Sequence, residues 1–289
     1  MIEYNITFRK LKNEKVDFQK IYTWCQNKYV YEWFEQRKLT IKEIEEKYKN
    51  KLKEKKQDLY IIMCNDIDIG LVQIYPFNND VNIDILKQCN SIYEYDLFIG
   101  EEQYLNKGIG KQIIRLINQK IYNEYPSDAI ILRPFKRNIR AVKCYEKSNF
   151  KMIYEYTDTD TLGNIEGIII MLNKLDRWKF GTKPNELIKL VLEGKKTATT
   201  SLYKNDKPTE EGDISILTNS NNQYICKIKT KKEIITEFKN ITWDLAKLEG
   251  ENNTLEEWKT THKKYFQTIN KNFNDNTKVA FEIFEVIDK

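Results

Sequence analysis

The chain has 289 residues, of which 40% are hydrophobic and 31% charged, so it carries enough apolar material to build a folded core. Two domains are expected at this length, because domains usually contain about 100–200 residues. The net charge is only +5, which argues against a protein that simply coats nucleic acid. Apolar runs such as Ile168–Leu172 are too short to cross a membrane and the N-terminus lacks signal-peptide features, so a cytoplasmic location is expected.

The cysteine and histidine content speaks against a metal site. Five cysteines without a CxxC pair and a single histidine, His262, can form neither a disulfide framework nor a Cys/His cluster, so no metal is expected. His262 lies among charged residues and is expected on a helix surface without a functional role. Cys144 has no base nearby in the sequence and is expected to be a buried thiol rather than a nucleophile.

The first part of the chain alternates between strand and helix patterns. Strands are predicted at Ile6–Leu11, Leu59–Cys64, Gly70–Tyr75, Ile92–Ile99, Ala129–Leu132, Met152–Tyr156 and Ile165–Leu172. Helices are predicted at Asp17–Asn27, Thr40–Lys56, Gly108–Tyr122 and Ile139–Ser148. Thr40 and Glu43 have the spacing of a capping box, and Asn138 is a candidate N-cap. This half therefore predicts a domain of mixed helix and strand.

The pattern restarts near Lys174, which predicts one domain over residues 1–174 and a second over 175–289. Pro184 opens a helix that ends at Gly194, and short helices are expected to start at Thr242 and Thr254. Strands are predicted at Asp213–Leu217, Tyr224–Lys231 and Val279–Ile287. Because strands dominate, a small barrel with peripheral helices is expected.

A glycine pair, Gly108 and Gly110, stands where the loop after a predicted strand enters a helix. Unpaired amides and the helix dipole make such a position suitable for a phosphate group. Gln112 after Lys111 excludes a P-loop, and Ile113 replaces the third glycine of the dinucleotide fingerprint. Glycines that only allow close packing of helix and strand are the alternative.

The charges nearby are unevenly distributed. Six acids and one base lie between Asp80 and Glu102, and nine bases and two acids lie between Lys107 and Lys143. This order suits an enzyme with a cationic substrate and an anionic cosubstrate, although each stretch could also be a solvated face.

The order of elements, the Lys107–Gly110 turn and the Asn138–Phe150 segment (Asn-x-x-Ala-x-x-x-Tyr) resemble the GNAT acetyltransferase superfamily. The resemblance covers residues 1–174 and implies an α+β fold, with a mixed central sheet flanked by helices, and acetyl-CoA as cosubstrate. Leu105 and Asn149 depart from the usual Gln/Arg and Gly, and Asn also adopts left-handed backbone. The residues that the resemblance assigns to coenzyme binding are Phe98, Ile99, Lys107, Gly108, Ile109, Gly110, Lys111 and Asn138.

Acetyl transfer to an amine requires a neutral nitrogen, stabilisation of the carbonyl oxygen and a proton for the leaving thiolate. The resemblance implies that backbone at Phe98–Ile99 polarises the carbonyl and that Tyr145 protonates the sulfur. Asp96 attracts the cationic amine and accepts its proton, directly or through water. Core packing is the alternative role for Tyr145, and Asp96 is otherwise a lone acid.

A closer similarity is to aminoglycoside 6′-N-acetyltransferases, carried by Glu32–Phe34, Leu39–Tyr48 and Tyr95-Asp96. It implies a small polycationic acceptor in an acidic, aromatic-lined site. Arg133 stands where that family commonly has an acid, and it would repel a cationic sugar if it faced the acceptor. A different small amine or a peptide N-terminus therefore stays open. The acceptor-binding candidates are Trp33, Tyr75, Glu94 and Asp96.

The segments Leu192–Thr199 and Glu251–Trp258 resemble the ASCH family, a small β-barrel similar to RNA-binding PUA domains, over residues 177–289. The resemblance implies a candidate site of Lys196, Thr199 and Glu251, in which the lysine activates the threonine and the carboxylate carries the proton. Three roles stay open: hydrolysis of N4-acetylcytidine, binding of RNA, a nucleotide or a nucleoside, and a structural or regulatory role. The plain alternative for Glu193–Thr197 is a helix end with a solvated loop.

The first hypothesis is thus an acetyl-CoA-dependent N-acetyltransferase with an accessory ASCH domain. The competing hypothesis is an RNA-linked protein that acts where the ASCH domain docks. The sequence leaves the oligomeric state open.

Overall fold

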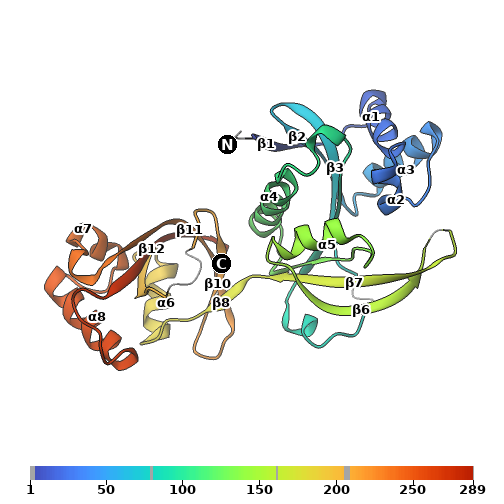
Figure 1. Ribbon diagram of the computed structural model, residues 1–289. Coiled ribbons are helices and arrows are strands. Elements are labelled where there is room, and N and C mark those ends of the chain that lie inside the picture. Colours follow the sequence, from blue (N-terminus) through green and yellow to red (C-terminus); the bar gives the residue numbers. More distant parts are fainter. Residues whose placement is uncertain (1–3, 79–80, 161, 205–208, 289) are drawn as a thin grey trace. The chain divides into compact units, whose positions relative to one another are not determined.

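The computed structural model describes residues 4–78, 81–160, 162–204 and 209–288. The chain divides into two compact units, Met1–Lys174 and Leu175–Lys289, each described here by itself (Figure 1). Among the described residues, no helix combines the length and apolar character that crossing a membrane requires.

The first unit is built on a seven-stranded mixed sheet with the order β1-β2-β3-β4-β5-β7-β6. Neighbouring strands are antiparallel except β4 and β5, which run parallel. The strands are β1 (Ile6–Lys10), β2 (Asp58–Cys64), β3 (Ile67–Pro76), β4 (Ile92–Ile99), β5 (Ala129–Leu132), β6 (Lys151–Thr159) and β7 (Ile165–Lys174). All seven predicted strands of this half are therefore present.

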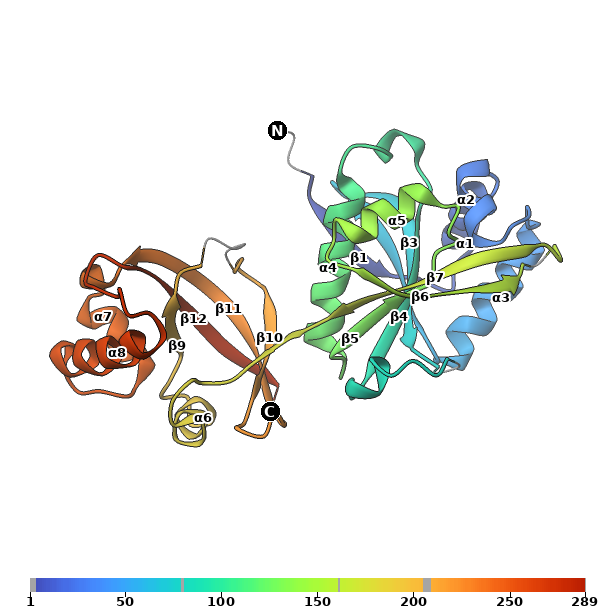
Figure 2. The same cartoon turned by 60° about the horizontal axis from the view of Figure 1, so that its bottom comes forward.

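Helices cover this sheet in two groups, which Figures 1 and 2 show from two directions. The first group packs on a core that includes Phe18, Ile21, Ile44 and Leu71. In the second group, α4 buries Ile113 and Ile117, and α5 lies beside it. The helices are α1 (Lys15–Cys25), α2 (Lys28–Phe34), α3 (Ile41–Glu54), α4 (Ile109–Glu124) and α5 (Ile139–Glu146), with 3₁₀ turns at Leu86–Gln88 and Glu102–Tyr104.

The predicted Thr40–Glu43 capping box is present at the start of α3. Helix α2 was not predicted, because its seven residues are too few for a clear helical period.

Strand β4 separates from β5 halfway along its length. It pairs with β3 from Tyr93 to Ile99, but with β5 only from Ile92 to Glu94. Strand β5 ends at Leu132, just before Pro134, which has no N–H to continue a ladder. One side of β4 from Tyr95 onward is therefore left without a parallel partner strand.

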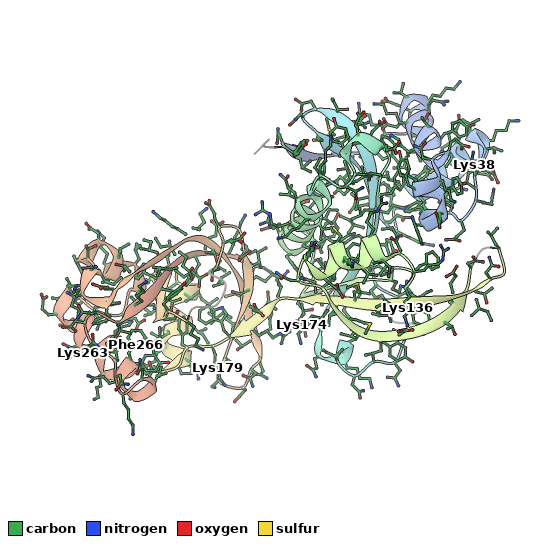
Figure 3. All side chains as sticks on the ribbon, viewed as in Figure 1. Lys38, Lys136, Lys174, Lys179, Lys263 and Phe266 are labelled. Atoms are coloured by element: carbon green, nitrogen blue, oxygen red, sulfur yellow. The ribbon has the colours of Figure 1, made fainter. Side chains whose placement is uncertain are left out.

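The second unit is a five-stranded sheet with the order β8-β10-β11-β12-β9, curled into a half-barrel. One face packs on α8 through Phe238, Trp258 and Phe266, the last labelled in Figure 3, and the other packs on α6. The elements are β8 (Asp176–Trp178), α6 (Pro184–Leu192), β9 (Ala198–Leu202), β10 (Ile214–Thr218), β11 (Tyr224–Glu237), α7 (Trp243–Ala246), α8 (Leu255–Ile269) and β12 (Lys278–Asp288), with 3₁₀ turns at Phe238–Asn240 and Lys247–Glu249.

One expectation for this unit was wrong: the helix after Thr254 is not short but has 15 residues. In addition, Ala198–Leu202, for which no element was predicted, form strand β9. Strand β9 escaped prediction because its five residues do not alternate between apolar and polar side chains, and its pairing with β12 decides the conformation.

Candidate active site

The turn before α4 has the features of an anion-binding helix terminus. Gly108, the N-cap, has a φ of 78°, a left-handed conformation that glycine adopts without strain. No side chain caps the first turn and no acid lies in it, so its amides are not covered by a neighbouring carboxylate. Lys107 and Lys111 are exposed on either side. These residues fit the diphosphate of coenzyme A.

The two glycines of this turn serve different purposes. A Cβ on Gly108 would meet no atom within 4 Å, so backbone conformation is what requires glycine there. A Cβ on Gly110 would lie 3.3 Å from Cys144 Sγ, so this glycine brings α4 and α5 close together. The side chain of Ile109 is buried in the core, which leaves only its backbone for a ligand. Cys144 is half-buried rather than buried, and burial raises the pKa of its thiol.

The remaining coenzyme candidates lie on β4 and α5. Phe98 is buried, with its ring 4.9 Å from that of Phe34 and 6.2 Å from that of Trp24, so packing holds this part of β4 in place. Phe98 and Ile99 belong to the portion of β4 that has left β5. Asn138 caps α5, where its Oδ1 accepts the N–H of Ala141 at 3.2 Å.

A cavity of about 480 Å³ lies between α2 and the start of α5. It brings Trp33, an acceptor candidate, together with Asn138, a coenzyme candidate. The guanidinium of Arg137 lies 4.6 Å from the centre of the Trp33 ring and 3.0 Å from a carboxylate oxygen of Glu32. The complete lining is Lys28, Tyr29, Glu32, Trp33, Arg137, Asn138, Ile139 and Arg140, with more cations than acids.

Of the predicted catalytic pair, Asp96 acts electrostatically on Tyr145. Asp96 retains solvent-accessible surface, yet desolvation by the surrounding protein raises its pKa above the ordinary value. A hydrogen bond from Tyr75, 2.8 Å from Asp96 Oδ2, opposes that rise. Burial and the charge of Asp96 raise the pKa of Tyr145, so the phenol keeps its proton at neutral pH.

Glu94 is already engaged by another side chain. Its carboxylate is buried and bound in two-pronged fashion by Arg133, with Nε to Oε1 at 2.7 Å and Nη2 to Oε2 at 2.8 Å. The sequence predicted Glu94 as an acid that lines the acceptor site and Arg133 as a residue that could repel a cation. The two side chains instead neutralise each other, so Glu94 does not offer a second negative charge to an amine.

The sequence reasoning missed Lys51 and Gln73. Gln73 is buried on β3 directly opposite Asp96, and it accepts a hydrogen bond from Lys51 of α3. Burial, with the nearby charge of Lys47, lowers the pKa of Lys51 to about 8. Lys51 lies four residues after Lys47 and seven after buried Ile44. This helical spacing could have indicated that Lys51 faces the protein interior.

The second unit contains a buried ionic cluster around Glu249. Lys196, 1% exposed, lies 2.8 Å from Glu249 Oε2 and 2.5 Å from Glu251 Oε1. Glu249 Oε1 also accepts hydrogen bonds from Thr200 at 2.6 Å and from Trp258 at 3.2 Å. Two of the three predicted residues, Lys196 and Glu251, thus meet, whereas sequence reasoning missed Glu249 and Thr200.

Thr199 and His262 differ in placement from what the sequence led us to expect. On β9, Ala198 and Thr200 are buried, and Thr199 lies between them and projects to the opposite face of the strand. His262 is buried rather than on the surface, stacked 4.1 Å from Trp258 and with Nε2 3.3 Å from Glu249. Because charged residues flank His262 in the sequence, its position on the buried face of the helix was not predicted. In the described residues, no group of three or more His, Cys, Asp or Glu side chains is arranged to hold a metal ion.

Comparison with known proteins identifies the families of the two units. The family described as "Acetyltransferase (GNAT) domain" matches residues 13–157, half of the chain, so the protein belongs to the GNAT acetyltransferases, enzymes that use acetyl-CoA. Residues 176–288 match the ASCH domain family, so the chain joins a GNAT acetyltransferase domain to an ASCH domain.

Individual relatives are distant. Aminoglycoside N(6′)-acetyltransferase type 1 of Klebsiella pneumoniae is 25% identical over 139 residues, 47% of this chain and 69% of the relative. The crystal structure of aminoglycoside acetyltransferase AAC(6′)-Ib with coenzyme A and kanamycin is 23% identical, covering 59% of this chain and 95% of that one, with a TM-score of 0.48. An uncharacterized protein from Bacillus halodurans is 17% identical, covering 59% and 84%, with a TM-score of 0.50.

Proposed function

We propose that residues 1–174 transfer the acetyl group of acetyl-CoA to a primary amine of a small acceptor, with Asp96 and Tyr145 as the catalytic residues. The observation that carries the proposal is the position of Asp96 on the part of β4 that has left β5, where Tyr75 holds its carboxylate and its charge acts on Tyr145. The uncapped start of α4 follows β4 by fewer than ten residues in the chain. Acetyl-CoA supplies an activated thioester, and the remaining chemistry consists of proton transfers by side chains of this chain.

The two catalytic side chains have complementary protonation states. Ionised Asp96 attracts the ammonium form of the amine and accepts its proton, which frees the nitrogen lone pair. Its raised pKa makes it a stronger base than an ordinary carboxylate. Tyr145 holds its proton on Oη and can give it to a leaving thiolate. Backbone amides of Phe98 and Ile99 are proposed to polarise the carbonyl oxygen.

The binding residues that we propose are those assigned by the resemblance, and the geometry of the turn and the cavity supports them. Lys107, Gly108, Ile109, Gly110 and Lys111 are proposed to hold the diphosphate, and Asn138 to line the coenzyme channel beside the cavity. For the acceptor, Tyr75 supports Asp96, and Trp33 lines the cavity. Aminoglycosides are the first acceptors to test, because the sequence predicted a polycation and the curated relatives are named for that substrate.

We propose a structural role for the ionic cluster of the ASCH domain. Lys196 is buried and paired with two carboxylates, which leaves it poorly suited to act as a base toward Thr199. Acetate release from N4-acetylcytidine that is lost in Thr199→Ala, or RNA retention whose salt slope is lost in Lys195→Ala, would instead support the competing hypothesis.

The proposed function is tested by measuring free-thiol release from acetyl-CoA with a panel of amines. Asp96→Asn and Tyr145→Phe should each lower kcat/KM by about 10²–10⁴, the usual contribution of a general acid or base. Asp84→Asn is the matched control, because Asp84 is exposed and pairs with Lys87 on the surface. Unchanged rates in both catalytic variants would disprove the assignment.

A further inference from the structure

The acceptor side of Asp96 is less acidic than the sequence indicated. Of the six acids between residues 80 and 102, Asp80 lies outside the described residues, Asp84 pairs with Lys87, and Glu101 accepts the indole N–H of Trp24. Glu94 is bound by Arg133. Among the described residues of this stretch, Asp96 and Glu102 remain. Asp96 is the acid that we assign to an incoming amine.

Cationic side chains flank Asp96 from two directions. Arg133, at the end of β5, and Lys51, on α3, both lie close enough for their charges to stabilise the carboxylate of Asp96. The third such cation, Lys47, is paired with Glu35. Together the carboxylates of Glu94 and Asp96 are at least balanced by the charges of Arg133 and Lys51.

Lys51 is held in place rather than free to swing away. Its Nζ donates to Gln73 Oε1 and lies 3.4 Å from Gln57 Oε1. Gln73 is 2% exposed and stands opposite Asp96 in the β3–β4 register, so it fixes the ammonium beside the catalytic carboxylate. Glutamine oxygens accept hydrogen bonds without cancelling the positive charge of Lys51.

We propose that Lys51 forms a cationic subsite beside Asp96, and that the acceptor is an amine that also carries an anionic group, a carboxylate or a phosphate. The ammonium of such a molecule binds Asp96 while its anionic group faces Lys51. A polycation would place a second ammonium against Lys51, with a repulsive interaction that the partly desolvated surroundings strengthen. This inference rests on the proposed function and narrows its acceptor class.

The test compares matched acceptors on the full chain by free-thiol release from acetyl-CoA. Glucosamine 6-phosphate is paired with glucosamine, and phenylalanine with phenethylamine, while kanamycin and spermidine represent polycations. We expect kcat/KM to be at least tenfold higher for the anionic member of one or both pairs than for its neutral partner and for the polycations. The pair that responds identifies phosphate or carboxylate as the anionic group.

Variants of Lys51 separate the subsite from general effects. Lys51→Met and Lys51→Gln, checked for folding by circular dichroism, should reduce the ratio between anionic and neutral acceptors toward one. Lys53→Met on the exposed side of the same helix should keep the ratio. A Lys51→Gln protein that folds and retains the full ratio would overturn the subsite.

The outcomes distinguish the subsite from the proposed function. Faster turnover of kanamycin or spermidine than of every anionic amine would refute the subsite and leave the acetyltransferase activity standing. No turnover with any amine in the panel would refute both.

Discussion

Replacing Lys196 by methionine is expected to destabilise the second unit severely. The ammonium of Lys196 is 1% exposed and is the cation nearest to Glu249, itself 1% exposed, and also contacts Glu251. Removing one partner of a buried ion pair typically costs about 3–5 kcal/mol, because the other charge stays buried without compensation. For a unit of this size, the loss corresponds to a fall in melting temperature of roughly 12–20 °C.

Scanning calorimetry of the full chain measures this melting temperature. Added coenzyme A should raise the melting temperature of the first unit only, which distinguishes the transitions of the two units. Lys195→Met is the control next door: its side chain is 65% exposed and pairs only at the surface, so the melting temperature should not change measurably. Adding Glu249→Gln to Lys196→Met should recover part of the loss, because a neutral amide needs no counter-ion.

The pH dependence gives an independent check. Burial acts to raise the pKa of Glu249, but the charges of Lys196 and His262 outweigh it and hold the pKa below its ordinary value of 4.5. A carboxylate with a lowered pKa stabilises the fold above about pH 4.5. This stabilisation is lost as the pH falls toward the lowered pKa. The difference between parent and Lys196→Met should therefore shrink below pH 4.5. A Lys196→Met protein that melts like Lys195→Met would refute this reasoning.

Three further predictions concern the first unit. The acidic limb of the kcat/KM profile should lie above the ordinary carboxyl pKa of 3.8, because the reaction needs ionised Asp96; Tyr75→Phe removes a hydrogen bond that lowers this pKa, so the limb should move to higher pH. Gly108→Val should weaken coenzyme A binding measured by calorimetry, because valine at φ 78° adds about 1–3 kcal/mol of backbone strain. The control Gly167→Val, on β7 and without positive φ, should leave binding unchanged. Arg133→Met should lower the stability of this unit by about 3–5 kcal/mol, because it leaves the charge of buried Glu94 without a partner. Arg133→Met/Glu94→Gln should recover part of that stability. Equal melting temperatures of the single and double variants would contradict the pairing.

Local patterns were enough to predict most of the elements of both units. Alternating apolar residues define β4, and the Thr40–Glu43 spacing fixes the start of α3, because hydrogen bonds and burial within a few residues decide both. Gly108 is local in the same sense, because its positive φ favours glycine, whereas Gly110 reflects the packing of α4 against α5. For β4 and the start of α3, the structure therefore has the elements that the sequence predicted.

Partnerships between distant residues were beyond the sequence. Whether Arg133 repels an acceptor or neutralises Glu94 depends on how two parallel strands align, and Gln73 meets Asp96 only through the β3–β4 register. His262 turns inward because α8 packs on β11 and β12, against the polarity of its neighbours in the chain. The sequence determined where charges and elements occur along the chain. Only the tertiary structure decided which charges meet, because electrostatic energy depends on separation and burial in space.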